Sequence, residues 1–322
     1  MEMLKMDTFN KPKILLLGNG INREFGENAV SWSELLNSIT TNHYVGTELD
    51  ALALKNKKNN IKSPAVPFPL EIVLRTDDNI DVAIKNAKTK LYGNVNKDEQ
   101  KELLRKLLSL GFDCILTTNY SYELEMAALN DGITLTDSRL SNMQTYSNPK
   151  KRAETKYLLH TYNSVEYNGI HNKIWHIHGE ARKPNTIIIG HYYGNILFKY
   201  KELLGKRRNS YQHTQDKGYT YEIKSWLDAF VLGDVYILGL GMDFSEMDLW
   251  WLINRKKRES AEHGKIVFYE PATDSFDIKK KLLEDYDVTI RSLGYSGNET
   301  TKPDYKNFYR DAIPDIKEQL QT

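Results

Sequence analysis

Three things are scarce in this 322-residue sequence: cysteine, an excess of charge of either sign, and long apolar runs. The single cysteine excludes a disulfide framework and any structural zinc site that is built from several thiolates. The 44 basic and 43 acidic side chains leave a net charge of +1, so no strong positive field favours nucleic acid as a partner. The longest apolar runs have the length of a strand and fall far short of a membrane span.

The first residues contain no apolar stretch of the length that a secretion signal needs. We therefore expect a soluble, cytoplasmic protein. Hydrophobic residues make up 40% of the chain, which is enough for a globular core. The length fits either two domains or one large domain with insertions.

Short apolar runs alternate with segments of helical spacing along the chain. The runs that end at glycine or at a polar turn predict strands over 13–17, 112–116, 157–162, 174–178, 186–189, 235–238, 265–269 and 288–290. Helical spacing and capping signals predict helices from 31, over 70–110 in two pieces, through Leu124 and Ala128, and over 195–230 with an interruption near Gly218. Further helices are predicted over 245–258 and 277–285, and from 304. This alternation indicates an α/β fold with a parallel sheet that is covered on both faces.

Four of the predicted strands end in glycine-rich or polar turns. In open parallel sheets, ligands bind beyond the carboxyl ends of the strands. We expect these turns to meet at one crevice: Gly18-Asn19-Gly20, Thr118-Asn119, His178-Gly179 and Gly239-Leu240-Gly241.

The two glycine-rich turns suggest contacts with a dinucleotide. Gly18-Asn19-Gly20 precedes a helix whose first N–H groups favour a pyrophosphate, but Arg23 stands where a dehydrogenase fingerprint has its third glycine. The alternative is an ordinary strand-to-helix turn. The turn at Gly239–Gly241 suits an adenosine or a ribose, and Asp243 could accept a hydrogen bond from a ribose hydroxyl. Alternatively, Asp243 or Ser245 caps the next helix.

Asn119 and His178 are the candidate catalytic residues. The Asn119 amide could hold a ribose hydroxyl or orient a water, although Asn119 or Ser121 could instead cap the next helix. At the end of its strand, His178 could act as a general base. His176 is expected to share a strand face with His178, which gives the pair the spacing of metal ligands. No carboxylate recurs at a matching spacing, so we predict that no metal is bound.

Other conspicuous residues have structural interpretations. Cys114 lies inside a predicted strand and is expected to be an inert core residue. The aromatic pair Trp250 and Trp251 is expected to pack in the core or at an interface. The basic residues at 255–258 end a predicted helix, where cations suit the helix dipole, and we interpret them as a solvated helix end.

Taken in this order, the four turns resemble those of the sirtuin (silent-information-regulator-two-like) family. In that family a glycine-rich first turn, a Thr-x-Asn turn, a catalytic His-Gly and a late Gly-x-Ser-like turn surround NAD. The matching segments are GNGIN at 18–22, TTNY at 117–120, HIHG at 176–179 and GLGMDFSEMD at 239–248. The segment SWSELL at 31–36 is similar to a divergent bacterial branch, and the GNG turn with a distant IHG is similar to bacterial abortive-infection proteins.

The resemblance implies a Rossmann-like parallel sheet with helices on both faces, helical insertions and no zinc module. It further implies a single nucleotide-binding domain over 1–322, with insertions at about 46–110 and 135–215. The activity implied is an NAD hydrolase that releases nicotinamide and ADP-ribose in anti-phage (abortive infection) defence. Asn119 and His178 would be catalytic, and NAD would contact Gly18, Asn19, Gly20, Ile21, Asn22, Thr118, Gly239, Gly241, Asp243 and Ser245.

Other functions stay open at this point. The family's deacylases carry a four-cysteine zinc module, which a chain with one cysteine cannot build, but deacylation remains the alternative within the same fold. The chain could also bind NAD or ADP-ribose without turnover, or use His176 and His178 in a metal hydrolase. An NADase must be held inactive until it is needed, so we expect a homo-oligomer or a separately encoded partner, with no membrane and no direct nucleic acid.

Overall fold

A computed structural model describes the residues that form the sheet and most of its helices. These residues are 11–26, 98–129, 144–146, 154, 156–188, 192–216, 225–242, 246–259, 264–272, 278–294 and 304–321. The predicted helix from 31, the first helical piece after 70, Gly218, Asp243 and Ser245 lie outside them. In the described part of the chain, no helix is both long enough and apolar enough to cross a membrane.

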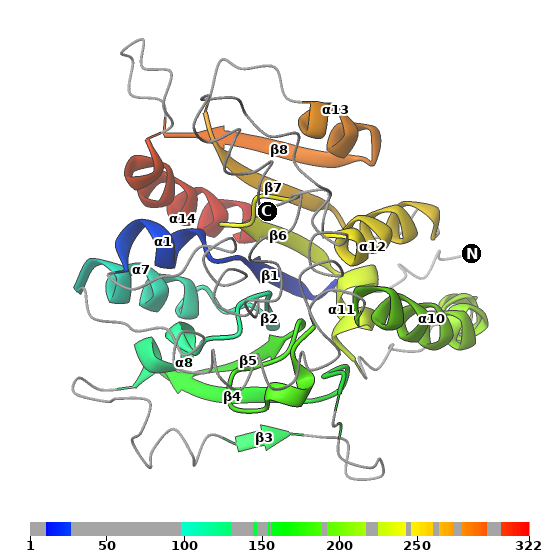
Figure 1. Cartoon of the computed structure of the whole chain (residues 1–322). Helices are drawn as coiled ribbons and strands as arrows, with labels where there is room; N and C mark the ends of the chain where they lie inside the picture. The colour runs from blue at the N-terminus through cyan, green and yellow to red at the C-terminus, as the bar shows by residue number, and fades with distance from the viewer. Residues whose placement is uncertain are drawn as a thin grey trace, which may run out of the picture.

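Within these ranges, eight strands form one sheet in the order β3-β4-β5-β2-β1-β6-β7-β8 (Figure 1). The strands are β1 (Lys13–Leu17), β2 (Cys114–Thr117), β3 (Gln144–Tyr146), β4 (Tyr162–Tyr167), β5 (Ile170–His176), β6 (Asp234–Leu238), β7 (Ile266–Pro271) and β8 (Val288–Leu293). From β5 to β8 every neighbouring pair is parallel, whereas β3 and β4 pair antiparallel at one edge.

The order of the parallel strands confirms the predicted Rossmann-like α/β class. Starting at β1, the chain adds β2 and then β5 on one side, and later adds β6, β7 and β8 on the other side. This is the Rossmann order 3-2-1-4-5-6, in which the winding reverses beside the first strand. The reversal falls between β1 and β6, where ligands bind in sheets of this kind.

Helices cover both faces of the sheet (Figure 1). One face carries α1 (Gly20–Phe25), α7 (Asp98–Leu108), α8 (Glu123–Ala128) and α14 (Tyr305–Gln321), and the other carries α10 (Tyr192–Asp216), α11 (Trp226–Leu232), α12 (Met247–Arg258) and α13 (Ile278–Asp285). Successive side chains of β1 point to opposite faces of the sheet, so the strand contributes to a hydrophobic core on each face. Leu15 and Leu17 pack with the first set of helices, and Ile14 and Leu16 with the second.

The segment 156–188 departs from the predicted strands. The strands predicted over 157–162 and 186–189 are wrong, because β4 begins at Tyr162 and Pro184–Thr186 forms a 3₁₀ turn. Asn168 and Gly169 both have positive φ, 51° and 77°, as a tight hairpin turn requires, and they join β4 to β5. The Asn-Gly pair in the sequence is the signal for this hairpin. Since β5 ends at His176, His178 lies beyond the strand.

Other predictions are settled by burial. Cys114 is buried in β2, and burial raises the pKa of its thiol, which confirms an inert core residue. Trp250 and Trp251 pack against the core, as predicted. The interpretation of residues 255–258 as a solvated helix end is wrong for Lys256, which is 3% exposed. The described parts of the two expected insertions belong to the main fold: α7 packs on the sheet, and β4 and β5 extend it.

Candidate active site

The register of the parallel strands brings the four predicted turns together. Leu17 of β1 is paired with Thr117 of β2 on one side and with Leu238 of β6 on the other. Thr117 is in turn paired with His176 of β5. The turns after these four residues therefore leave the sheet at the same level, next to the reversal between β1 and β6.

The two glycine turns pack directly on each other. The Gly18 nitrogen donates to the Leu238 carbonyl and the Gly20 nitrogen to the Gly239 carbonyl, both at 2.9 Å. A Cβ atom on Gly18 would lie 2.4 Å from the Gly239 oxygen, so only glycine allows this approach. Gly241 differs, because a Cβ atom there would meet none of the described residues within 4 Å. Gly18 and Gly20 thus serve the contact between the turns, whereas Gly241 makes no such close approach within the described part of the chain.

The rest of the first turn is anchored in the fold. The Ile21 side chain is 1% exposed and packs in the core. Asn22 is buried; its amide nitrogen donates to Asn19 Oδ1 at 3.0 Å, and its amide oxygen accepts from Gln100 Nε2 at 3.1 Å. The first bond is local to the start of α1, and the second fastens α1 to α7. The predicted contact of Asn19, Ile21 and Asn22 with NAD stays a prediction.

Asn119 is held in place at both its backbone and its side chain. Its backbone nitrogen donates to Thr117 Oγ1 at 3.1 Å, and its side-chain amide donates to the Gly18 carbonyl at 3.3 Å. Tyr122 occupies the N-cap position of α8, so the capping interpretation of Asn119 and Ser121 is wrong. The Asn119 amide lies instead against the first glycine turn. Thr118 joins the end of β2 to the end of β1, since its nitrogen donates to the Leu17 carbonyl at 3.3 Å.

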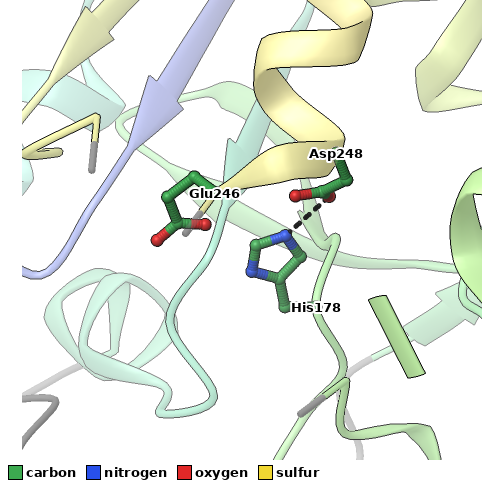
Figure 2. Close-up of side chains that lie close together, drawn as sticks. All are labelled: His178, Glu246 and Asp248. Atoms are coloured by element: carbon green, nitrogen blue, oxygen red, sulfur yellow. Dashed lines mark hydrogen bonds and ion pairs between the residues drawn. The ribbon is translucent and has the colours of Figure 1, made fainter. Parts of the chain in front are cut away.

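His178 forms a buried pair with Asp248 at the start of α12 (Figure 2). Its Nε2 lies 2.9 Å from Asp248 Oδ2, and the two side chains are 2% and 0% exposed. The Tyr200 hydroxyl donates to the same carboxylate oxygen at 3.3 Å, and the Tyr193 ring meets the imidazole edge-on. Because a carboxylate only accepts, Nε2 carries the proton of the neutral ring, and Nδ1 is the basic nitrogen.

The surroundings of His178 set its charge. Burial by itself lowers the pKa of the imidazole, but the charge and the hydrogen bond of Asp248, together with the charge of Glu246, more than offset it. The net result is a raised pKa. Among the described residues, none donates a hydrogen bond to the buried Oδ1 of Asp248, so this oxygen can accept from a further donor.

His178, Glu246 and Asp248 could also hold a cation. One ligand atom from each residue lies within 4.8 Å of the others, and Figure 2 shows both carboxylates beside the imidazole. One nitrogen and two oxygen donors suit a divalent transition metal. Glu246 occupies the N-cap position of α12. Because Asp243 and Ser245 lie outside the described residues, their interpretation as caps stays a prediction. The prediction that no metal is bound has to be tested by experiment.

The expectation that His176 and His178 share a strand face is wrong. His176 lies 2.9 Å from Glu125 of α8, whereas His178 bonds Asp248 of α12. These two helices cover opposite faces of the sheet. The rings diverge because β5 ends at His176 and the chain then turns at Gly179, whose φ is +94°. The two histidines therefore do not form a metal pair.

Sequence reasoning missed the partners of both histidines. Asp248 lies beside Leu249 and one turn before Leu252, both fully buried, and a carboxylate on the apolar side of a helix is a signal for a buried partner. Glu125 lies likewise between the buried Leu124 and Met126.

The comparisons with known proteins do not place the chain in a family. No protein-family model matches the sequence, and no curated protein matches it. Function is therefore inferred from the site and from the four turns that the fold brings together.

Proposed function

We propose that this protein is an NAD hydrolase of the zinc-free, sirtuin-like bacterial branch, which splits NAD into nicotinamide and ADP-ribose. One observation carries the proposal: Asn119 and the His178–Asp248 pair lie at neighbouring strand ends, next to two glycine turns at the reversal of a Rossmann sheet. Dinucleotides bind at this place in Rossmann folds. A polar amide and a buried base at neighbouring strand ends supply what cleavage of a glycosidic bond requires.

The reaction makes modest demands on the protein. The bond between C1′ of the ribose and the pyridinium nitrogen breaks, and its electron pair goes to nicotinamide, which leaves as a neutral molecule. A water oxygen bonds to C1′ and gives up one proton. The protein has to hold the ribose, tolerate an oxocarbenium-like transition state and place the water.

Each residue has a role in this proposal. Asn119 positions the ribose or the water, and Nδ1 of His178 accepts the proton from the water or from a ribose hydroxyl. Asp248 orients the ring and stabilises the imidazolium that forms. The turn at 18–22 and Thr118 lie on the pyrophosphate side, and the segment 239–245 on the adenosine side.

The test is the release of nicotinamide from NAD by the purified protein, followed by chromatography. We expect turnover by the wild type and a loss of about 100-fold or more in Asn119→Ala and His178→Ala, because a general base or a positioning group contributes about that much. His171→Ala is the matched control, since His171 is an exposed histidine of β5 that pairs with Glu166. Wild-type rates in both site variants would overturn the assigned roles.

The same samples separate the alternatives. Binding of NAD or ADP-ribose without nicotinamide release would indicate a nucleotide sensor. Release that depends on an added acetylated peptide would indicate a deacylase.

The proposal extends to biology and to regulation. An active NADase depletes the NAD pool of its own cytoplasm, so we place the protein in bacterial anti-phage defence, held inactive by homo-oligomerisation or by a separately encoded partner. Cells that express the wild type should resist phage better than cells that express His178→Ala. Measuring mass and activity together across protein concentrations tests oligomeric control.

A further inference from the structure

The second histidine of the site, His176, is fully engaged by the protein itself. Its Nδ1 lies 2.7 Å from the backbone carbonyl oxygen of Asn119, and its Nε2 lies 2.9 Å from Glu125 Oε1. The side chain is 2% exposed. Unlike His178, this ring therefore has no nitrogen left for a substrate.

Both partners of His176 are hydrogen-bond acceptors. A carbonyl and a carboxylate can be satisfied together only if both ring nitrogens carry protons, which makes His176 an imidazolium. The charges around it agree: burial lowers the pKa, but Glu125, Glu180 and the Asn119 carbonyl raise it to about 9 overall. The Asn119 carbonyl thus receives a charge-assisted hydrogen bond, which is stronger than a neutral one.

Glu125 is itself held in a buried network. Its Oε1 also accepts from Asn163 Nδ2 of β4 at 3.0 Å. The Tyr122 hydroxyl donates to Glu180 Oε2 at 3.0 Å, and the Tyr122 ring lies 5.2 Å from the imidazole. Because these groups come from α8, β4 and the turn after β5, the His176 ring is locked from several sides.

The locked His176 ring restrains the backbone of Asn119. Its backbone nitrogen is bound by Thr117 and its backbone oxygen by His176, whereas its side chain makes a longer bond of 3.3 Å to Gly18. The backbone is thereby fixed while the amide can exchange its weaker bond for one to a ligand. A side chain that has to meet a ribose or a water within a fraction of an ångström needs such support.

We propose that His176 and Glu125 form a positioning pair, which holds the backbone of Asn119 so that its amide meets the ribose or the water. This role rests on the proposed NAD hydrolysis. His176 is not a catalytic residue, since it acts through Asn119.

The test uses Glu125→Gln and His176→Gln in the full chain, with His171→Gln as the matched control. His171 is another histidine of β5 with a glutamate partner, but the pair is exposed and 3.8 Å apart. We expect kcat for NAD hydrolysis to fall about 10- to 100-fold in the two site variants, with KM changed less than about twofold, because misplacement by about an ångström has this effect. His171→Gln should keep wild-type values.

A second readout does not depend on activity. Amide hydrogen exchange of the segment 117–122 should become faster in both site variants, while exchange in β1 and β6 stays at the wild-type rate. Glu125→Gln preserves the size of the side chain, so this variant tests the positioning role by itself if His176→Gln does not fold.

The outcomes separate the two proposals. Wild-type kcat and wild-type exchange of 117–122 in Glu125→Gln would overturn the positioning role while leaving NAD hydrolysis intact. A wild type that releases no nicotinamide would overturn the proposed function, and the exchange rates would still decide whether the pair holds Asn119. A uniform rise in amide exchange across the whole sheet would also overturn the positioning role, because it would show that His176 and Glu125 only stabilise the fold.

Discussion

At the scale of single residues, the chemistry of the site depends on which atoms two histidines have free. Both nitrogens of His176 contact acceptors of the protein, whereas His178, among the described residues, is bound through Nε2 alone, to Asp248. A strand that ended two residues later would have turned both rings to the same face. The early end of β5 is therefore what gives two neighbouring histidines different roles.

The pair with Asp248 predicts the pH dependence of the reaction. A base works only when it is deprotonated, so NAD hydrolysis should rise with pH through the raised pKa of His178, above its ordinary value of 6.5. Asp248→Asn removes the main charge that raises this pKa, and the rise should move to lower pH. Rate profiles of the wild type and the variant, with Glu166→Gln as an exposed control, measure the shift. An unchanged profile in Asp248→Asn would contradict a base that titrates against Asp248.

The proposed mechanism also predicts indifference to chelators. If His178 acts as a base paired with Asp248, EDTA treatment followed by desalting should leave nicotinamide release unchanged. Loss of activity that Mn²⁺ or Zn²⁺ restores would show instead that His178, Glu246 and Asp248 bind a cation. Elemental analysis of the purified protein gives an independent measurement.

At the scale of elements, the two ends of α12 make two different buried contacts. Its first turn carries Asp248 to His178, and its last turn carries Lys256 to the end of α11. Lys256 Nζ donates to the carbonyls of Phe230, Val231 and Gly233 at 3.0, 3.0 and 2.6 Å. Helix ends leave such carbonyls without partners inside the helix, and three N–H donors match three acceptors. Burial lowers the pKa of Lys256 to about 7.

Removing this contact should destabilise the protein. We expect Lys256→Met to lower the free energy of unfolding by about 2 to 4 kcal/mol, because it leaves buried carbonyls without donors. Lys257→Met, at the exposed next position, should change it by less than about 1 kcal/mol. Urea unfolding followed by circular dichroism compares the two variants. Equal stabilities would mean that Lys256 does not hold α11.

At the scale of the whole molecule, the last helix, α14, contacts the first glycine turn and α1. A Cβ atom on Gly20 would lie 1.9 Å from the Tyr309 hydroxyl of α14, and 2.9 Å from Gly239. Gly20 therefore lies closely packed between α14 and the turn after β6. Gly20 and Tyr309, which are in contact, are 289 residues apart in sequence (309 − 20).

A pair of substitutions tests this contact. Gly20→Ala should destabilise the fold by about 1 to 3 kcal/mol through overpacking, and Tyr309→Phe in the same chain should recover part of the loss by removing the hydroxyl. Gly194→Ala is the control, since a Cβ atom there meets no residue of the described ranges within 4 Å. Thermal unfolding of the single and double variants measures the recovery. Strictly additive effects would contradict direct contact.

Local sequence pattern was enough to predict much of the sheet. Continuous apolar runs identified β1, β6 and β7, because a strand that is buried on both faces has apolar residues at successive positions. The same pattern placed polar turns after β1, β2 and β6, which the register of the parallel strands then brought together. It did not predict the hairpin of β4 and β5, whose strands are half exposed and whose Asn-Gly turn carries the signal.

By itself the sequence determined the α/β class, the glycine turns and the presence of Asn119 and His178 at strand ends, because these follow from residue type and short-range spacing. The tertiary structure decided the rest. Asp248, Glu125 and Lys256 found their partners 70, 51 and 23 to 26 residues away, and only the fold brings such groups within hydrogen-bond distance. A buried charge needs a partner, and which partner it has is a property of packing between elements.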